Sequence, residues 1–269
     1  MNRVLLILFM LLSAGPSSPG ETETKRPVVV VTTTLIETAV RDLMEPHVDI
    51  IRLMPPGSCP GHFDLSPGQV RAMTGSDLFV RHDYQSSLDD GLIKSGIDTE
   101  RIHPVPSHDS FVIPESYAAM CRELAARLAD AWPDYAPHVH TRARAVEQRA
   151  KDEEQRARDR LRPLNGRRVL AANYQQAFCE WAGLNVVAVY FAGADSSAWL
   201  LSRAVDMART AGADAVIGNQ QWGERHLEAL TEAARLPGIM LGNYPFSGEA
   251  GAYWDFFHAN VDALINGLP

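Results

Sequence analysis

The sequence predicts an α/β protein with two lobes, each a mainly parallel sheet flanked by helices, joined by a long rigid helix. Short β-rich runs alternate with helical periodicity along both halves of the chain, which is typical of parallel sheets. Between the halves, residues 138–162 are dense in Arg, Glu, Ala and Gln, as in a helix with one solvated face. Such a helix would span roughly 36 Å, enough to bridge two lobes. A surface helix of a single domain would show the same pattern.

The first half of the chain alternates between the two kinds of pattern. In chain order it contains a strand over 28–32, a helix over 35–44, a strand over 48–54, a helix over 67–74, a strand over 77–81, a helix over 87–95, a strand over 102–105 and a helix over 115–131. The start of one helix is marked by Ser66 and Pro67. Serine accepts a hydrogen bond at the N-cap, and proline fits the first turn.

The second half restarts the alternation after the long helix. In chain order it contains a strand over 167–172, a helix over 175–182, a strand over 186–190, a helix over 196–211, a strand over 215–218, a helix over 224–234, a strand over 239–241 and a helix over 249–266. The halves therefore look alike in layout, which suits two lobes around a cleft.

The amino terminus has the features of an export signal. Arg3 precedes an apolar run over 4–12 that is too short to span a bilayer, and small and polar residues follow it. We therefore expect a periplasmic mature protein. The expected boundaries are a signal peptide over 1–20, an N-terminal α/β lobe over 27–132, a linking helix over 134–163 and a C-terminal α/β lobe over 164–269.

The net charge and the cysteine content indicate which kinds of partner and site to expect. The net charge of −8 argues against nucleic acid as a partner and suits a soluble protein that handles a cation. Three cysteines leave at least one unpaired. Cys121 and Cys179 lie in helical patterns, so we expect both to be buried structural thiols. Cys59 lies in a loop, where a metal ligand and one half of a disulfide are both open interpretations.

The loop over 55–67, which reads PPGSCPGHFDLSP, is the most informative segment. Cys59 and His62 have the spacing and the softness to hold a transition metal together. The loop follows a predicted strand, and open α/β sheets bind small molecules at the carboxyl ends of their strands. We expect Asp64 to orient a ligand or cap the next helix rather than bind metal itself.

Three short motifs carry a resemblance to a known family: the Pro55-Pro56-Gly57 turn, the run from His62 to Pro67, and Ser76-Asp77-Leu78 before the next strand. With them the chain resembles the metal-specific solute-binding proteins of ABC transporters, the zinc, manganese and iron class. The resemblance covers almost all of the mature chain. It implies a metal site in the cleft between the lobes, holding a divalent transition metal, with zinc first and manganese or iron next. It also implies delivery to the membrane permease of an ABC transporter. We expect a monomer.

The resemblance also implies a set of ligands. The family commonly uses three histidines and a carboxylate, one from each of four loops, and His62 matches the first. Alignment to a downstream proline places Asp109 at the second position, and a shift of one residue would use His108 instead. Cys59 and His82, the latter just past the third predicted strand, are additional candidates.

Amides stand in the matching segments of the second lobe. The third position falls among Asn173, Tyr174 and Gln175, the fourth falls near Asn243, and Asn219 lies where the family often carries an acid. Amides are weak ligands for transition metals. Either the first lobe supplies most ligands, or the cleft takes a metal already held by a small chelator that hydrogen-bonds to these amides.

Two other classes of function stay open. One is a binding protein for a metal chelate or another small organic solute. The other is an exported metalloenzyme in which Cys59, His62 and His82 activate water. The sequence has no H-E-x-x-H and no G-x-S-x-G motif. We therefore predict that the protein is not an enzyme.

Overall fold

The computed structural model describes residues 26–56, 66–94, 96–108, 110–191 and 197–269. The predicted signal peptide over 1–20 lies outside these ranges, as do the candidate ligands Cys59, His62 and Asp109. Within the described ranges, no helix combines the length and the apolar character needed to cross a membrane.

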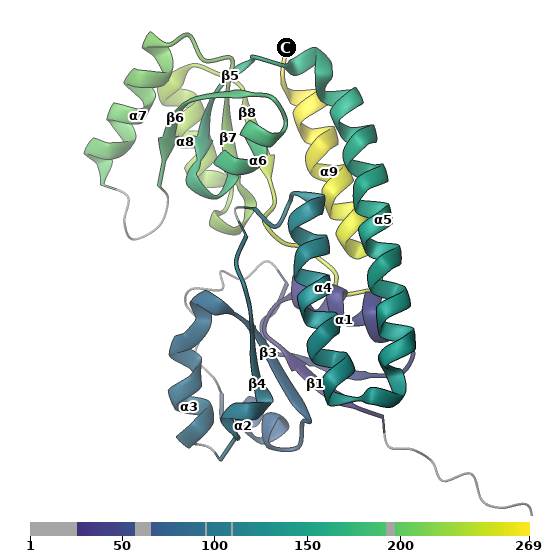
Figure 1. Cartoon of the computed structure of the whole chain (residues 1–269). Helices are drawn as coiled ribbons and strands as arrows, with labels where there is room; N and C mark the ends of the chain where they lie inside the picture. Colours follow the sequence, from purple (N-terminus) through teal and green to yellow (C-terminus); the bar gives the residue numbers. More distant parts are fainter. Residues whose placement is uncertain (1–25, 57–65, 95, 109, 192–196) are drawn as a thin grey trace, which may run out of the picture.

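Two parallel four-stranded sheets form the framework of the molecule (Figure 1). The first consists of β1 (Val28–Val31), β2 (Asp49–Arg52), β3 (Leu78–His82) and β4 (Ile102–Val105). The second consists of β5 (Arg168–Ala172), β6 (Asn185–Tyr190), β7 (Ala215–Asn219) and β8 (Gly238–Leu241). The strand orders, β2-β1-β3-β4 and β6-β5-β7-β8, are equivalent. The predicted pair of parallel sheets is therefore confirmed, and we call the parts built on them the first and second lobes.

Helices flank both sheets and connect them. They are α1 (Thr34–Met44), α2 (Pro67–Thr74), α3 (Asp89–Lys94), α4 (Pro114–Ala131), α5 (Ala136–Leu161), α6 (Gln176–Trp181), α7 (Ala198–Thr210), α8 (Glu224–Ala234) and α9 (Ala252–Gly267). The predicted long helix is α5, and its buried residues recur every three or four positions, so one face is solvated. The predicted start of α2 is also confirmed, since the Ser66 hydroxyl accepts a hydrogen bond from the Gln69 N–H.

Four helices begin later than their sequence patterns indicate, namely α3, α6, α7 and α9. Short 3₁₀ turns, Asp83–Leu88 and Asn173–Gln175, precede α3 and α6. Both of these turns, before α3 and α6, follow directly on a strand. In the first, the Gln85 side-chain oxygen accepts a hydrogen bond from the His82 N–H, which fixes a tight turn where the strand ends.

One apolar core runs through both lobes. It contains buried residues of α1, α4, α5 and α9 as well as of both sheets, among them Val29 on β1, Val146 on α5 and Val169 on β5. Smaller cores lie under α2 and α3 on the first sheet and under α7 and α8 on the second. Because the central core is continuous, a large relative movement of the lobes would expose buried apolar surface.

The two described cysteines belong to this central core. Cys121 and Cys179 are both buried and form no disulfide, as the sequence predicts. Burial raises the pKa of both thiols. They are therefore inert packing groups rather than reactive sites.

Candidate metal centre at the junction of the two sheets

The carboxyl ends of the two sheets meet at a junction between the lobes (Figure 1). The Thr34 hydroxyl at the start of α1 donates a hydrogen bond to the Pro245 carbonyl beyond β8, at 2.6 Å. Nearby, the hydroxyl groups of Tyr84 and Tyr244 are 2.7 Å apart. Sequence reasoning missed both tyrosines. The available signal was their position just after strand ends that carry candidate ligands.

His82, the last residue of β3, is fully buried at this junction. Its Nε2 lies 3.0 Å from the Thr33 hydroxyl, whereas its Nδ1 is buried without a hydrogen-bond partner. The ring stacks on Tyr84 with centroids 5.1 Å apart, and Phe111 and Tyr244 lie against it. Buried polar atoms in native proteins nearly always have a partner, so an unpartnered ring nitrogen points to a ligand.

The electrostatics of His82 suit metal binding. Burial lowers the pKa of its ring to about 3, although the neighbouring Asp83 carboxylate acts to raise it. The imidazole is therefore uncharged at neutral and mildly acidic pH. Transition metals bind this neutral form. In the tautomer whose Nε2–H donates to the Thr33 hydroxyl, Nδ1 presents a lone pair.

Asp83 positions the other described candidate, His108. Its carboxylate accepts hydrogen bonds from the N–H of Ser107, at 2.9 Å, and from the Ser107 hydroxyl. Burial acts to raise the pKa of Asp83, but the hydrogen bonds it accepts outweigh this effect and lower the pKa below its usual value. The carboxylate is therefore ionised at neutral pH. His108 follows immediately, and its Nε2 is buried without a partner. Because β3 and β4 pair in parallel, His82 and His108 follow strand ends at the same edge.

Both flanks of the segment 57–65 lie at this edge as well. The Gln85 side chain binds the His82 N–H through its oxygen and the Met54 sulfur through its Nε2, at 3.0 and 3.7 Å. Gln69 on α2 donates from Nε2 to the Leu53 carbonyl at 2.7 Å. The chain therefore leaves β2 and enters α2 at the edge that carries His82. The ligands predicted within that segment stay predictions.

The second lobe brings its predicted amides together at the other side of the junction. Gln175 is fully buried; its Nε2 donates to Asn243 Oδ1 at 2.5 Å, and its Oε1 has no partner. Asn219 accepts a hydrogen bond from the Gln221 N–H at 3.2 Å, while its Nδ2 is buried and unpartnered. Asn173 Oδ1 is likewise buried and unpartnered. We call Asn173, Gln175, Asn219 and Asn243 the amide cluster.

The described residues fit only part of a metal site. Among them, no three His, Cys, Asp or Glu side chains lie together as a ligand set. The first lobe offers the neutral ring of His82 and the unpartnered nitrogen of His108. The second lobe offers amides, which coordinate transition metals weakly. A full ligand set at this junction would need further residues or ligands that arrive with a metal.

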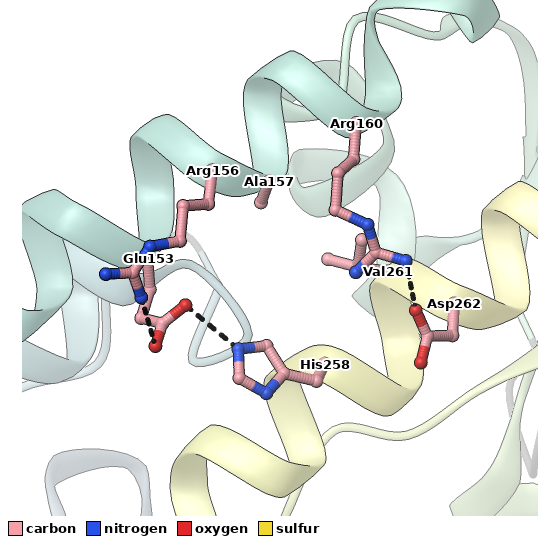
Figure 2. A pocket seen from close by; sticks show the side chains of 7 residues that line it. All are labelled: Glu153, Arg156, Ala157, Arg160, His258, Val261 and Asp262. Carbon is pink, nitrogen blue, oxygen red and sulfur yellow. Dashed lines mark hydrogen bonds and ion pairs between the residues drawn. The ribbon is translucent and has the colours of Figure 1, made fainter.

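A hollow of about 420 Å³ lies between α5 and α9, away from the junction (Figure 2). It is lined by Glu153, Arg156, Ala157, Arg160, His258, Val261 and Asp262, and we call it the α5–α9 groove. Glu153 lies 3.0 Å from the His258 Nε2 and 3.1 Å from Arg156, and Arg160 pairs with Asp262 at 2.5 Å. These charged groups satisfy one another, within α5 for Glu153 and Arg156 and across the two helices for the other two pairs.

Comparison with known proteins gives a consistent result. The family model described as zinc-uptake complex component A, periplasmic (ZnuA), matches residues 29–267. The periplasmic zinc-binding protein TroA from Treponema pallidum has a TM-score of 0.76 at 16% identity, covering 90% of this chain and 99% of its own. None of the curated protein sequences compared with the chain matches it.

Two further solved structures share the fold. The solute-binding protein FpvC from Pseudomonas aeruginosa, in complex with Ni²⁺, has a TM-score of 0.76 at 17% identity, covering 91% of this chain and 97% of its own. The laminin-binding protein of Streptococcus agalactiae has a TM-score of 0.76 at 14% identity, with 90% and 100% covered. At these identities the likeness establishes the fold.

Proposed function

The chain belongs to the ZnuA family of periplasmic zinc-uptake components, and we propose from this premise that it captures a divalent transition metal at the junction between its lobes and delivers it to an ABC transporter permease. The family is one of solute-binding transport proteins. The match spans both sheets, α5 and all the described candidate residues.

His82 is the observation that carries the proposal. The His82 ring is completely buried and uncharged, and its Nδ1 has no hydrogen-bond partner. It lies at the junction, where the strands of both sheets end. A buried imidazole nitrogen without a partner is unfavourable unless a ligand binds it. We propose that His82 binds the metal with the other first-lobe candidates, which are Cys59, His62 and either His108 or Asp109.

Several finer features belong to the same proposal. The imidazoles and the Cys59 thiol favour zinc, with manganese or iron next. We assign 1–20 as a cleaved signal peptide, 27–132 and 164–269 as the lobes, and 134–163 as the linking helix of a periplasmic monomer. The continuous central core supports release of the metal by movement of the loops around the junction rather than by wide opening of the lobes.

Elemental analysis tests the proposal directly. The mature protein, purified without chelator or affinity tag, is expected to carry one equivalent of zinc, manganese or iron. A double variant, Cys59→Ala with His62→Ala, is expected to lose it. The variant His140→Ala, which changes an exposed histidine on α5, is the control and is expected to retain the metal. A wild-type protein that binds no metal even after incubation with each ion would overturn the proposal.

A further inference from the structure

We propose that the amide cluster of the second lobe holds the cargo by hydrogen bonds to ligands that the metal brings with it, and does not coordinate the ion itself. This inference rests on the proposed function, because it takes a metal as the cargo. It names the form in which that metal is bound: an ion that keeps oxygen ligands, either water or the hydroxyl and carboxylate groups of a small chelator.

Unpartnered buried atoms are the first observation behind the inference. Gln175 is 0% exposed and Asn219 is 3% exposed, and each has one amide atom without a partner. Asn173 adds a third such atom. Folded proteins leave few buried polar side-chain atoms unsatisfied, and three of them at one strand edge mark a place where hydrogen-bonding groups bind.

The geometry places these atoms opposite the first-lobe histidine. Asn219 pairs with Leu241 in the sheet register, and Gln175 Nε2 lies 3.5 Å from the Leu241 carbonyl, so the amides share one edge. Tyr244 follows the cluster directly, and its ring centroid lies 5.9 Å from that of His82. The amide cluster and His82 therefore form the two sides of one junction.

The orientation of Gln175 decides which atom faces a ligand. Its Nε2 has three oxygen neighbours, which are the carbonyls of Leu241 and Gly242 and the Oδ1 of Asn243. All three are acceptors, so this end of the amide is the NH₂ group and Oε1 is the atom left over. Oε1 accepts hydrogen bonds, and its natural partner is an O–H group.

Because the amide cluster carries no charge, it suits neither a bare cation nor a free anion at this position. Each hydrogen bond within it joins an amide to another amide or to backbone. A bare cation would need anionic or imidazole ligands, and a free anion would need a positive partner. A metal-bound water or hydroxyl group needs neither, because its charge is compensated by the ion and its hydrogens are met by carbonyl oxygens.

Water proton relaxation of the Mn²⁺-loaded protein, combined with retention of labelled citrate, tests the inference and separates the two sources. High relaxivity shows that the bound ion keeps exchangeable water. Low relaxivity with one equivalent of citrate retained alongside the metal identifies a chelator. Either result supports the inference. Bound Mn²⁺ that keeps neither water nor citrate would overturn it, whereas failure to bind any metal would overturn the proposed function instead.

Two variants connect the result to the cluster. Gln175→Leu and, as a milder change at a less buried position, Asn173→Ala are expected to weaken Mn²⁺ binding about fivefold to tenfold through the loss of a hydrogen bond to the ion's ligand. Gln148→Leu on the exposed face of α5 is the matched control and leaves binding unchanged. Unchanged affinity in folded Gln175→Leu and Asn173→Ala proteins would also sink the inference.

Discussion

The junction and the α5–α9 groove are both polar regions between packed elements, yet they differ in how their polar groups are satisfied. In the groove, each charged lining residue has an opposite charge or a histidine partner. At the junction, nitrogens of His82 and His108 and three atoms of the amide cluster are buried without a partner. The groove is a hollow of about 420 Å³, but its charged groups have no need of a ligand because they pair with one another. The proposed site therefore rests on the unpartnered atoms gathered at the junction and not on the volume of a hollow.

The largest effect expected from the difference between the junction and the groove is the loss of metal binding in the variant His82→Phe. Phenylalanine keeps the ring that stacks on Tyr84 and removes the nitrogens. We expect the dissociation constant of the metal to rise at least about 100-fold, because loss of a ligand exceeds the loss of a group that only orients one. Competition with a chromophoric chelator measures it.

The matched control for that change lies in the groove. His258→Phe makes the same substitution beside Glu153 and should leave the dissociation constant of the metal unchanged. The metal-free His82→Phe protein should also unfold within about 1 kcal/mol of the wild type, since it loses one hydrogen bond and one unpartnered buried nitrogen. Equal losses of metal affinity in the two variants would remove the distinction between the regions.

The next effect concerns stability and belongs to the groove. Glu153 is 7% exposed and faces His258, Arg156 and Arg149. We expect Glu153→Gln to lower the free energy of unfolding by about 1–2 kcal/mol near neutral pH, since it removes a charged hydrogen-bond acceptor. Metal affinity should not change. Denaturant titration with and without metal measures both quantities.

The pH dependence of that loss has a definite sign. Burial acts to raise the pKa of Glu153, but the hydrogen bond with His258 and the nearby positive charges lower it below its usual value. The carboxylate therefore stabilises the fold above its ordinary pKa, and the contribution disappears as pH falls through the lowered value. The difference between Glu153→Gln and wild type should shrink below about pH 4. If the difference in the free energy of unfolding between Glu153→Gln and wild type stayed constant below about pH 4, the charge-based explanation would be refuted.

A smaller effect tests whether the junction itself is held closed. Tyr84→Phe removes the hydroxyl that bonds to Tyr244 across the lobes. One such hydrogen bond contributes about 1 kcal/mol, so metal should dissociate about fivefold faster. Stopped-flow mixing with excess chelator measures the rate. Tyr135→Phe, the same change on the tyrosine immediately before α5, should leave the rate unaltered; equal acceleration in both would show that this hydrogen bond does not restrain the metal.

Local features made much of the fold predictable. Alternating periodicity predicted both sheets and the long helix, because each pattern is complete within one element. Ser66 and Pro67 predicted the start of α2 for the same reason, since capping is decided within one turn. His82 could be named as a candidate because it lies just past a predicted strand, where α/β sheets place ligands, and its binding of metal stays a prediction.

Contacts between distant segments were not predictable in this way. Tyr84 and Tyr244 are 160 positions apart, and Glu153 and His258 are 105 apart. Such pairs depend on how the lobes and helices meet, which no local pattern encodes. The buried state of Gln175 and its bond to Asn243 likewise depend on the parallel order β5-β7-β8. The sequence showed which amides were present but not that they bind one another and leave single atoms unpaired.

The smallest expected effect is that of Arg160→Gln in the groove. Arg160 and Asp262 form a close pair, but both side chains are about half exposed, at 48% and 50%. Such surface pairs contribute between zero and about 1 kcal/mol, and salt screens them. We expect the thermal midpoint to fall by only a degree or two at low salt and the difference to vanish near about 0.5 M salt. Metal affinity should be the same in both conditions. A salt-dependent loss of metal affinity in this variant would show that the α5–α9 groove is coupled to the junction, and the two regions would then have to be treated as one functional unit.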